Sequence, residues 1–136
     1  TILGLDREYK MVIVGTGNLG QALANYTKYY KLGFPIIGMF DVNPKIIGLR
    51  INDIEVMDSE NLLDFLNSNH VDIGIITTDK AAAQSVADKL VEGGVRGIWN
   101  FAPCDLKVPK NVPVENVHVT DTLNSLVYHI IHAEDD

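Results

Sequence analysis

Cysteine is almost absent from this chain, since Cys104 is the only one in 136 residues. A single cysteine excludes an intramolecular disulfide and fits a reducing compartment. No apolar run reaches the ~18 residues that span a bilayer, and no signal-peptide pattern opens the sequence. We therefore expect a cytoplasmic protein that does not associate with membranes.

Positive charge is also scarce. Lysine and arginine number 11 against 18 acidic residues, which gives a net charge of −7, and the basic residues form no run. Nucleic-acid binding needs a concentrated positive surface that displaces counterions from phosphates. These residues by themselves are therefore not expected to bind DNA.

Features of an enzyme are missing too. The four histidines are scattered without the spacing of a metal site, and His70 precedes a predicted strand, at the edge of the sheet opposite to a ligand crevice. The chain has no nucleophile elbow, and it has no second domain to supply the acid–base residue of a dehydrogenase. We expect no catalytic residue, no metal and no enzymatic activity.

Apolar strand-like runs alternate with helix-like segments along the whole chain. This order predicts an α/β fold with a Rossmann-type doubly wound parallel sheet, as one domain over residues 1–136. Ser59 is expected to cap the helix that it precedes. The predicted strands are 10–14, 35–40, 71–77, 96–100 and 116–119, with short β-like pieces over 46–56. The predicted helices are 18–31, 59–67 and one that starts at 79 or 80 and ends at Gly93-Gly94.

The most informative stretch runs from Lys10 to Ala24, where a short apolar strand is followed by Gly15-x-Gly17-x-x-Gly20 and the start of a helix. In a dinucleotide-binding loop the first glycine permits the tight turn, the second lets the pyrophosphate approach the backbone, and the third lets helix and strand pack closely.

Asp41 follows Gly20 by 21 residues, at the end of the second apolar run. An acidic side chain at this place accepts hydrogen bonds from the adenosine ribose. The three residues after Asp41 include no arginine for a 2′-phosphate, which favours NAD(H) over NADP(H). A CoA-binding domain stays open as an alternative, because CoA carries its phosphate at the 3′ position.

The C-terminal helix, expected over 119–133 with Thr120 as its cap, has one continuous apolar face. The residues of this face are Leu123, Leu126, Val127, Ile130 and Ile131. The pattern fits a helix that packs on its own sheet and equally one that packs on a second subunit.

Several segments together resemble the Rex family of redox-sensing transcriptional repressors. They are residues 2–7, the glycine loop 14–20, 33–34, 40–41, 82–84, 97–98, Asn100-Phe101-Ala102-Pro103 and 108–109. The resemblance implies an NAD(H)-binding domain that binds NADH more tightly than NAD+ and so reports their ratio. It also implies a homodimer that exchanges its C-terminal helix near the partner's nicotinamide, and DNA that is released on NADH binding. The family's DNA-reading winged-helix domain precedes a segment like 2–7 and is not in this sequence, so we expect a fragment or a relative without it.

The resemblance also assigns the cofactor-binding residues. The pyrophosphate would lie on Gly15, Thr16, Gly17, Asn18, Leu19 and Gly20, the ribose on Asp41, and the nicotinamide half beside Thr77, Thr78, Asn100, Phe101, Ala102 and Pro103. A buried Asn100 that satisfies its own loop is the alternative to a cofactor contact. This chain departs from the family at Thr78-Asp79 and at His118-Val119, where an acidic residue of the inter-subunit switch is common.

Overall fold

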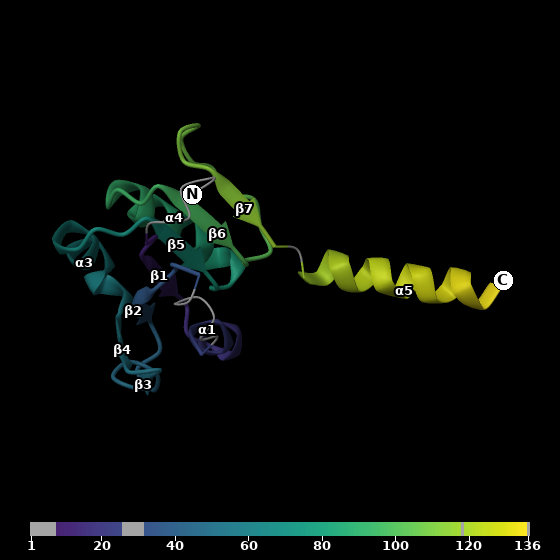
Figure 1. Cartoon of the computed structure of the whole chain (residues 1–136), viewed down its shortest axis with the longest axis horizontal. Coiled ribbons are helices and arrows are strands. Elements are labelled where there is room, and N and C mark those ends of the chain that lie inside the picture. The colour runs from purple at the N-terminus through teal and green to yellow at the C-terminus, as the bar shows by residue number, and fades with distance from the viewer. Residues whose placement is uncertain (1–7, 26–31, 118, 136) are drawn as a thin grey trace.

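The computed structural model describes residues 8–25, 32–117 and 119–135. Seven strands form one sheet in the order β3-β4-β2-β1-β5-β6-β7 (Figure 1). Every neighbouring pair is parallel except β3 and β4, which are antiparallel. The predicted α/β fold with a mostly parallel sheet is confirmed.

The element bounds follow the predicted alternation closely. The strands are β1 Met11–Val14, β2 Ile36–Asp41, β3 Arg50–Ile51, β4 Ile54–Asp58, β5 Ile73–Ile76, β6 Gly97–Asn100 and β7 Val114–Asn116. The helices are α1 Asn18–Ala24, the 3₁₀ turn η2 Ser59–Asn61, α3 Leu62–Ser68, α4 Lys80–Glu92 and α5 Val119–Asp135.

The strand order reverses at β1, which lies between β2 and β5. The chain first moves outward through β2 and β4, and then crosses to β5 on the other side of β1. Connections therefore diverge above the carboxyl ends of β1 and β5, and this is where open α/β sheets hold their ligands.

The apolar core lies on both faces of the sheet, because the central strands are buried on both sides. Val12 and Val14 of β1 belong to a cluster with residues of α3 and α4. Met11 and Ile13 face the opposite cluster, which includes Ala24 of α1. All four β1 side chains are at most 2% exposed, so β1 is a rigid base for the glycine loop that follows it.

Three boundaries differ from the prediction. The last strand is Val114–Asn116 and not 116–119, because Val119 already belongs to α5. Thr120 therefore lies inside α5 and is not its cap. The helical segment after β4 is capped by Asp58, whose Oδ1 accepts from Glu60 N at 3.0 Å, and not by Ser59, which is already within the 3₁₀ turn.

Some predictions fall on residues that the structure does not describe. The helix expected over 18–31 is described as α1 up to Ala24, and 26–31 lie outside the described residues. His118 and the N-terminal segment 2–7 also lie outside them.

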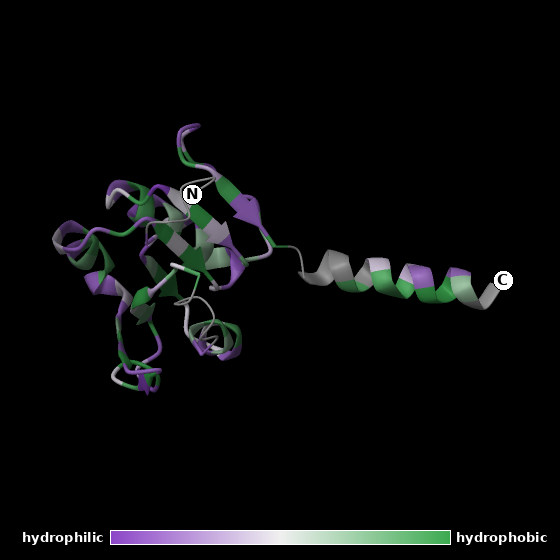
Figure 2. Ribbon diagram, in the orientation of Figure 1, coloured by the Kyte–Doolittle hydropathy of each residue, from purple (hydrophilic) through white to green (hydrophobic). Residues whose placement is uncertain are grey.

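Helix α5 extends away from the sheet beyond β7 (Figure 1). Apolar residues lie along one side of this helix (Figure 2). The large apolar side chains of this face are 45–58% exposed; they are Leu123, Leu126, Val127, Ile130 and Ile131. Its own sheet does not cover this face. None of the helices within the described ranges is long and apolar enough to cross a membrane.

Candidate functional site

Two glycines of the loop after β1 are required by the fold itself. Gly15 has φ +101°, a left-handed conformation, and a Cβ there would lie 2.8 Å from the backbone of Thr77. A Cβ on Gly20 would lie 2.1 Å from the carbonyl oxygen of Gly15. The loop therefore closes tightly on itself and on the end of β5, as the spacing predicts.

Gly17 is different from its two neighbours in the motif. Its φ is −72°, which any residue adopts, and a Cβ built on it meets nothing within 4 Å. The residue is exposed and lines a cleft. Its lack of a side chain is therefore not needed for packing within the described residues, and it leaves the cleft open at this position.

Thr16 connects the glycine loop to the end of β2. Its side chain is fully buried, and both its backbone N–H and its hydroxyl donate to Oδ2 of Asp41, at 2.7 and 2.9 Å. Gln21 of α1 donates to the carbonyl oxygen of Thr16 at 3.0 Å. Thr16 thus positions the Asp41 carboxylate and does not itself face the cleft.

Both oxygens of Asp41 accept hydrogen bonds from the chain. Besides the two from Thr16, its Oδ1 accepts from Val42 N at 2.7 Å and from Asn43 N at 2.9 Å. A carboxylate has about four acceptor positions, so a ribose hydroxyl that binds here must replace or share one of these donors. Burial raises the pKa of Asp41, but the hydrogen bonds from Asn43, Thr16 and Val42 outweigh it and bring the pKa below 3.8.

We expect Asp41 to make stability depend on pH. Because its pKa is lower in the folded than in the unfolded chain, its pH-dependent contribution is complete above the unfolded value near 3.8 and is lost as pH falls through the folded value. Urea denaturation of the parent and of Asp41→Asn at several pH values measures this. The difference between their free energies of unfolding should shrink on acidification; a difference that stays constant or grows would contradict it.

A cleft of about 410 Å³ lies at the carboxyl ends of β1, β2, β4 and β5. It brings together five of the predicted residues, namely Gly15, Gly17, Asp41, Thr77 and Thr78. Thr77 contributes to the loop as well, because its hydroxyl donates to the carbonyl oxygens of Gly15 and Val14, the latter at 3.2 Å. The two halves of the predicted phosphate and ribose site thus share one cleft.

The remaining predicted residues lie around this cleft or away from it. Asn18 and Leu19 are exposed in the first turn of α1. Residues 100–103 do not line the cleft. Phe101 packs against Trp99, with ring centroids 4.7 Å apart, and Pro103 is exposed.

Asn100 is fully buried and its side chain is engaged within the chain. Its amide nitrogen donates to Cys104 O and to Asn116 Oδ1, at 3.0 and 2.9 Å, and its Oδ1 accepts from Ala102 N at 3.0 Å. Of the two interpretations that the sequence leaves open, this geometry favours the residue that satisfies a buried loop.

The sequence reasoning missed several residues of the cleft. Ser85 and Lys89 of α4 stand four positions apart and so share one face of that helix. Ser59 directly follows β4, and β4 also ends at the cleft. The spacing of the α4 residues and the end of β4 are signals that could have identified them. The full set of missed lining residues is Val14, Val42, Ser59, Asp79, Ala82, Ser85, Val86 and Lys89.

At the opposite edge of the sheet, a histidine lies in contact with a buried carboxylate. His70 Nε2 lies 2.9 Å from Oδ1 of Asp72, a carboxylate that is 2% exposed and also accepts from Lys10 N at 3.0 Å. The pair stands before β5, away from the cleft, as expected. In the part of the chain that the structure describes, no group of three His, Cys, Asp or Glu residues is arranged to hold a metal.

Comparison with known proteins places this geometry in a family. A family model described as a CoA-binding domain matches residues 6–104. The chain belongs to the CoA-binding domain family. The redox-sensing transcriptional repressor Rex of Clostridium botulinum (strain Eklund 17B / Type B) is 55% identical over 130 residues, which are 96% of this chain and 62% of that repressor.

Solved structures agree with the sequence comparison. Crystal structures of RSP, a Rex-family repressor, in complex with β-NADH and in complex with β-NAD+ and operator DNA match with TM-scores of 0.91 and 0.92, each at 52% identity over 98% of this chain. The match covers 65% and 61% of those chains, so this chain spans about three-fifths of its Rex relatives. The resemblance to Rex is confirmed, and these relatives are named as repressors and not as enzymes.

Proposed function

We propose that this chain is the NAD(H)-binding domain of a Rex-type repressor and senses the ratio of NADH to NAD+. The observation that carries the proposal is the cleft with open space at Gly17 on one side and the Asp41 carboxylate on the other. It offers a pyrophosphate access to the backbone, and a ribose an acceptor, at the place where α/β folds bind dinucleotides. The similarity to repressors that bind NADH supports it.

Preference for NADH needs a difference between the two redox forms that the protein can read. NAD+ carries a cationic nicotinamide ring and NADH a neutral one, and an apolar environment penalises the cation. The nicotinamide half is proposed to lie beside Thr77 and Thr78, and the apolar residues Ala82 and Val86 also line this cleft. Each tenfold preference corresponds to about 1.4 kcal/mol of differential binding.

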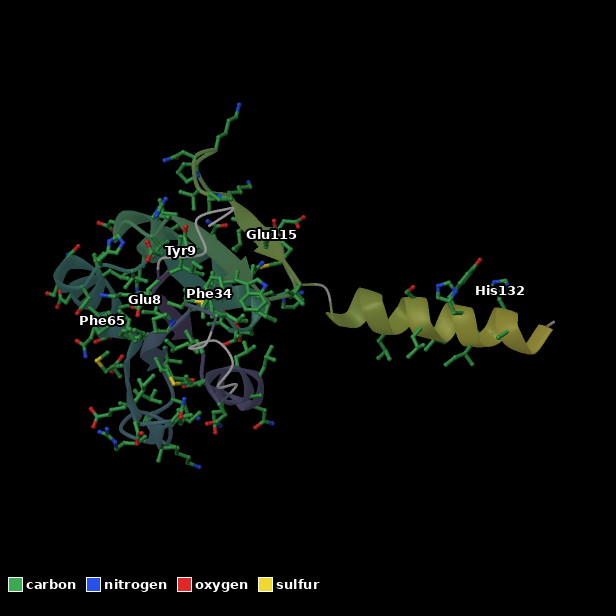
Figure 3. All side chains as sticks on the ribbon, in the orientation of Figure 1. Glu8, Tyr9, Phe34, Phe65, Glu115 and His132 are labelled. Atoms are coloured by element: carbon green, nitrogen blue, oxygen red, sulfur yellow. The ribbon has the colours of Figure 1, made fainter. Side chains whose placement is uncertain are left out.

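We further propose a homodimer in which α5 of one chain packs on the sheet of the other. This chain has two apolar surfaces that would cover each other in such a dimer. One is the apolar face of α5. The other is a groove of about 400 Å³ on the sheet, to which Phe34 and Glu115 contribute (Figure 3), with Met11, Ile73, Trp99 and Pro113 among the other lining residues.

Contact with operator DNA is proposed through a separate winged-helix domain, because these 136 residues carry a net charge of −7 and no basic run. NADH would then act by changing the arrangement of the dimer. A repressor of this kind works in the compartment that holds the DNA, and we therefore place it in the cytoplasm.

The test is a titration of the purified chain with NADH, followed by nicotinamide fluorescence, with NAD+, NADPH and CoA as competitors. We expect NADH to bind, and NAD+ to displace it only at concentrations at least about tenfold higher, a difference of about 1.4 kcal/mol. NADPH should compete weakly because its 2′-phosphate meets the Asp41 carboxylate.

A different outcome would reassign the chain within its family. If NADH does not bind, or if CoA displaces it better than NAD+ does, then the chain is a CoA-binding member and not a redox sensor. Equal affinity for NADH and NAD+ would leave a dinucleotide-binding domain without ratio sensing.

A further inference from the structure

Asn100 and Asn116 stand opposite each other at the last register position of β6 and β7, where both strands end. The amide of Asn100 donates to Oδ1 of Asn116 at 2.9 Å, and the two strands are also joined there by Val117 N, which donates to Asn100 O at 2.8 Å. Asn100 is 0% exposed. If this hydrogen bond broke, the buried amide of Asn100 would lose one of its acceptors, which costs free energy. The bond therefore favours a fixed arrangement of the two residues.

On one side of this pair lies the loop that leaves β6. Asn100 holds it through Ala102 N and Cys104 O. Phe101 N donates to Ile76 O at 2.9 Å, which joins the start of the loop to the end of β5. The loop is therefore attached to the strand that also ends at the cleft.

The far end of the same loop is fixed by Gln84 of α4. Its Nε2 donates to Lys107 O at 2.9 Å, and its Oε1 accepts from Lys107 N at 2.8 Å. With both ends attached to elements that border the cleft, the loop moves with the walls of the cleft and not independently of them.

On the other side of the pair the chain leads directly to α5. Helix α5 begins at Val119, three residues after Asn116, and Val117 is still bonded to β6. Figure 1 shows that α5 leaves the sheet from this strand end. Only two residues separate Asn116 from the start of α5, so the direction in which α5 leaves the sheet is set close to Asn116.

We propose that Asn100 and Asn116 form a positioning pair, which couples the loop beside the cofactor cleft to the direction of α5. The coupling to NADH rests on the proposed function, whereas the control of α5 by the pair does not. A shift of the loop on ligand binding would move Asn100, and its hydrogen bond to Asn116 would carry the start of α5 with it. Neither asparagine needs to touch the cofactor.

Two substitutions at the exposed residue Asn116 separate this role from a general structural one. Asn116→Ala removes the acceptor of the Asn100 amide. Asn116→Asp keeps an acceptor oxygen at the same place and should preserve the pair. Asn111→Ala, at another exposed asparagine in the segment before β7, is the matched control.

The experiment measures the distance between spin labels on Asn67→Cys in α3 and Ser125→Cys in α5, in a Cys104→Ser background. Both positions are exposed. Labelled chain is diluted into excess unlabelled chain, so that only distances within one chain are counted. The distributions are recorded without ligand and with saturating NADH, and the NADH dissociation constant is measured on the same samples.

Without ligand, we expect Asn116→Ala to broaden and shift the distance distribution, while Asn116→Asp and Asn111→Ala keep that of the parent. With NADH, the shift seen in the parent should be lost in Asn116→Ala, although its NADH affinity changes less than about threefold, or 0.7 kcal/mol. A parent-like distribution for Asn116→Ala in both conditions would overturn the proposal, as would identical behaviour of the Ala and Asp variants. Failure of the parent to bind NADH would overturn the proposed function and the NADH coupling, and the ligand-free distances would still decide whether the pair directs α5.

Discussion

Replacing Gly17 by valine is expected to abolish NADH binding while the domain stays folded. The added side chain meets no atom of the described chain within 4 Å of its Cβ, and φ −72° suits valine. It does fill the space through which a pyrophosphate would reach the backbone. We expect the NADH dissociation constant to rise at least about 100-fold, which corresponds to 2.7 kcal/mol.

The third glycine provides the contrast. Gly20→Ala puts a Cβ 2.1 Å from Gly15 O, so the loop must shift, at a cost of about 1–3 kcal/mol in the free energy of unfolding. Gly17→Val should change that free energy by less than about 1 kcal/mol. Urea denaturation and NADH fluorescence titration on both variants separate the two effects. Unchanged NADH affinity in Gly17→Val would show that the cleft at Gly17 is not the cofactor site.

The sequence was sufficient for those parts of the site that depend on local spacing. The positions of Gly15, Gly17 and Gly20 follow from a strand, a tight turn and a helix in immediate succession, and Asp41 ends the next strand. These relations need only the periodicity of each element and the rule that parallel strands end at one edge. The structure confirms the fold, and Gly15, Gly17 and Asp41 line one cleft, whereas Gly20 packs against the loop.

The parts that depend on contacts across the chain were beyond the sequence. Asn100 and Asn116 are 16 positions apart, and their contact arises only once β6 and β7 pair in register. The register itself was ambiguous, because valines at 112, 114, 117 and 119 fit an early and a late strand equally well. The strand forms at residues 114–116 because Val119 belongs to α5. Which of the two registers forms depends on packing with distant parts of the chain, and the local sequence pattern does not show it.

The same limit applies to Asp41. Its distance from the glycine loop predicts a ribose acceptor, but the spacing does not reveal that Thr16, Val42 and Asn43 already donate to both carboxylate oxygens. The charge of Asp41, which these bonds maintain by lowering its pKa, is therefore as important to its proposed role as its ability to accept a hydrogen bond from a ribose. The carboxylate repels a 2′-phosphate whether or not a ribose hydroxyl displaces one of the donors.

Charges placed on the apolar face of α5 are expected to separate the proposed dimer into monomers. Leu126 and Ile130 are 56% and 48% exposed in the single chain, and burying each against a partner would contribute about 1.5–3 kcal/mol. A symmetric dimer loses four such contacts, and each side chain is already about half covered in the single chain, so Leu126→Asp with Ile130→Asp should weaken dimerisation by roughly 3–6 kcal/mol, or about 100-fold to 10⁴-fold in the dissociation constant. Sedimentation velocity over a dilution series measures this.

Trp99 offers a second readout of the same event, because it lines the groove and is the only tryptophan of the chain. If α5 of the partner covers the groove, Trp99 emission lies at shorter wavelength in the parent dimer and shifts to longer wavelength as the double variant dissociates.

The control is Ser125→Asp. By the helical period of 3.6 residues, residue 125 lies on the side of α5 opposite to Leu123, so this variant should change neither the mass of the dimer nor the Trp99 emission. A double variant that remains dimeric would show that α5 is not the interface. A variant that dissociates with unchanged Trp99 emission would show that α5 pairs with something other than this groove, for example with the same helix of the second copy.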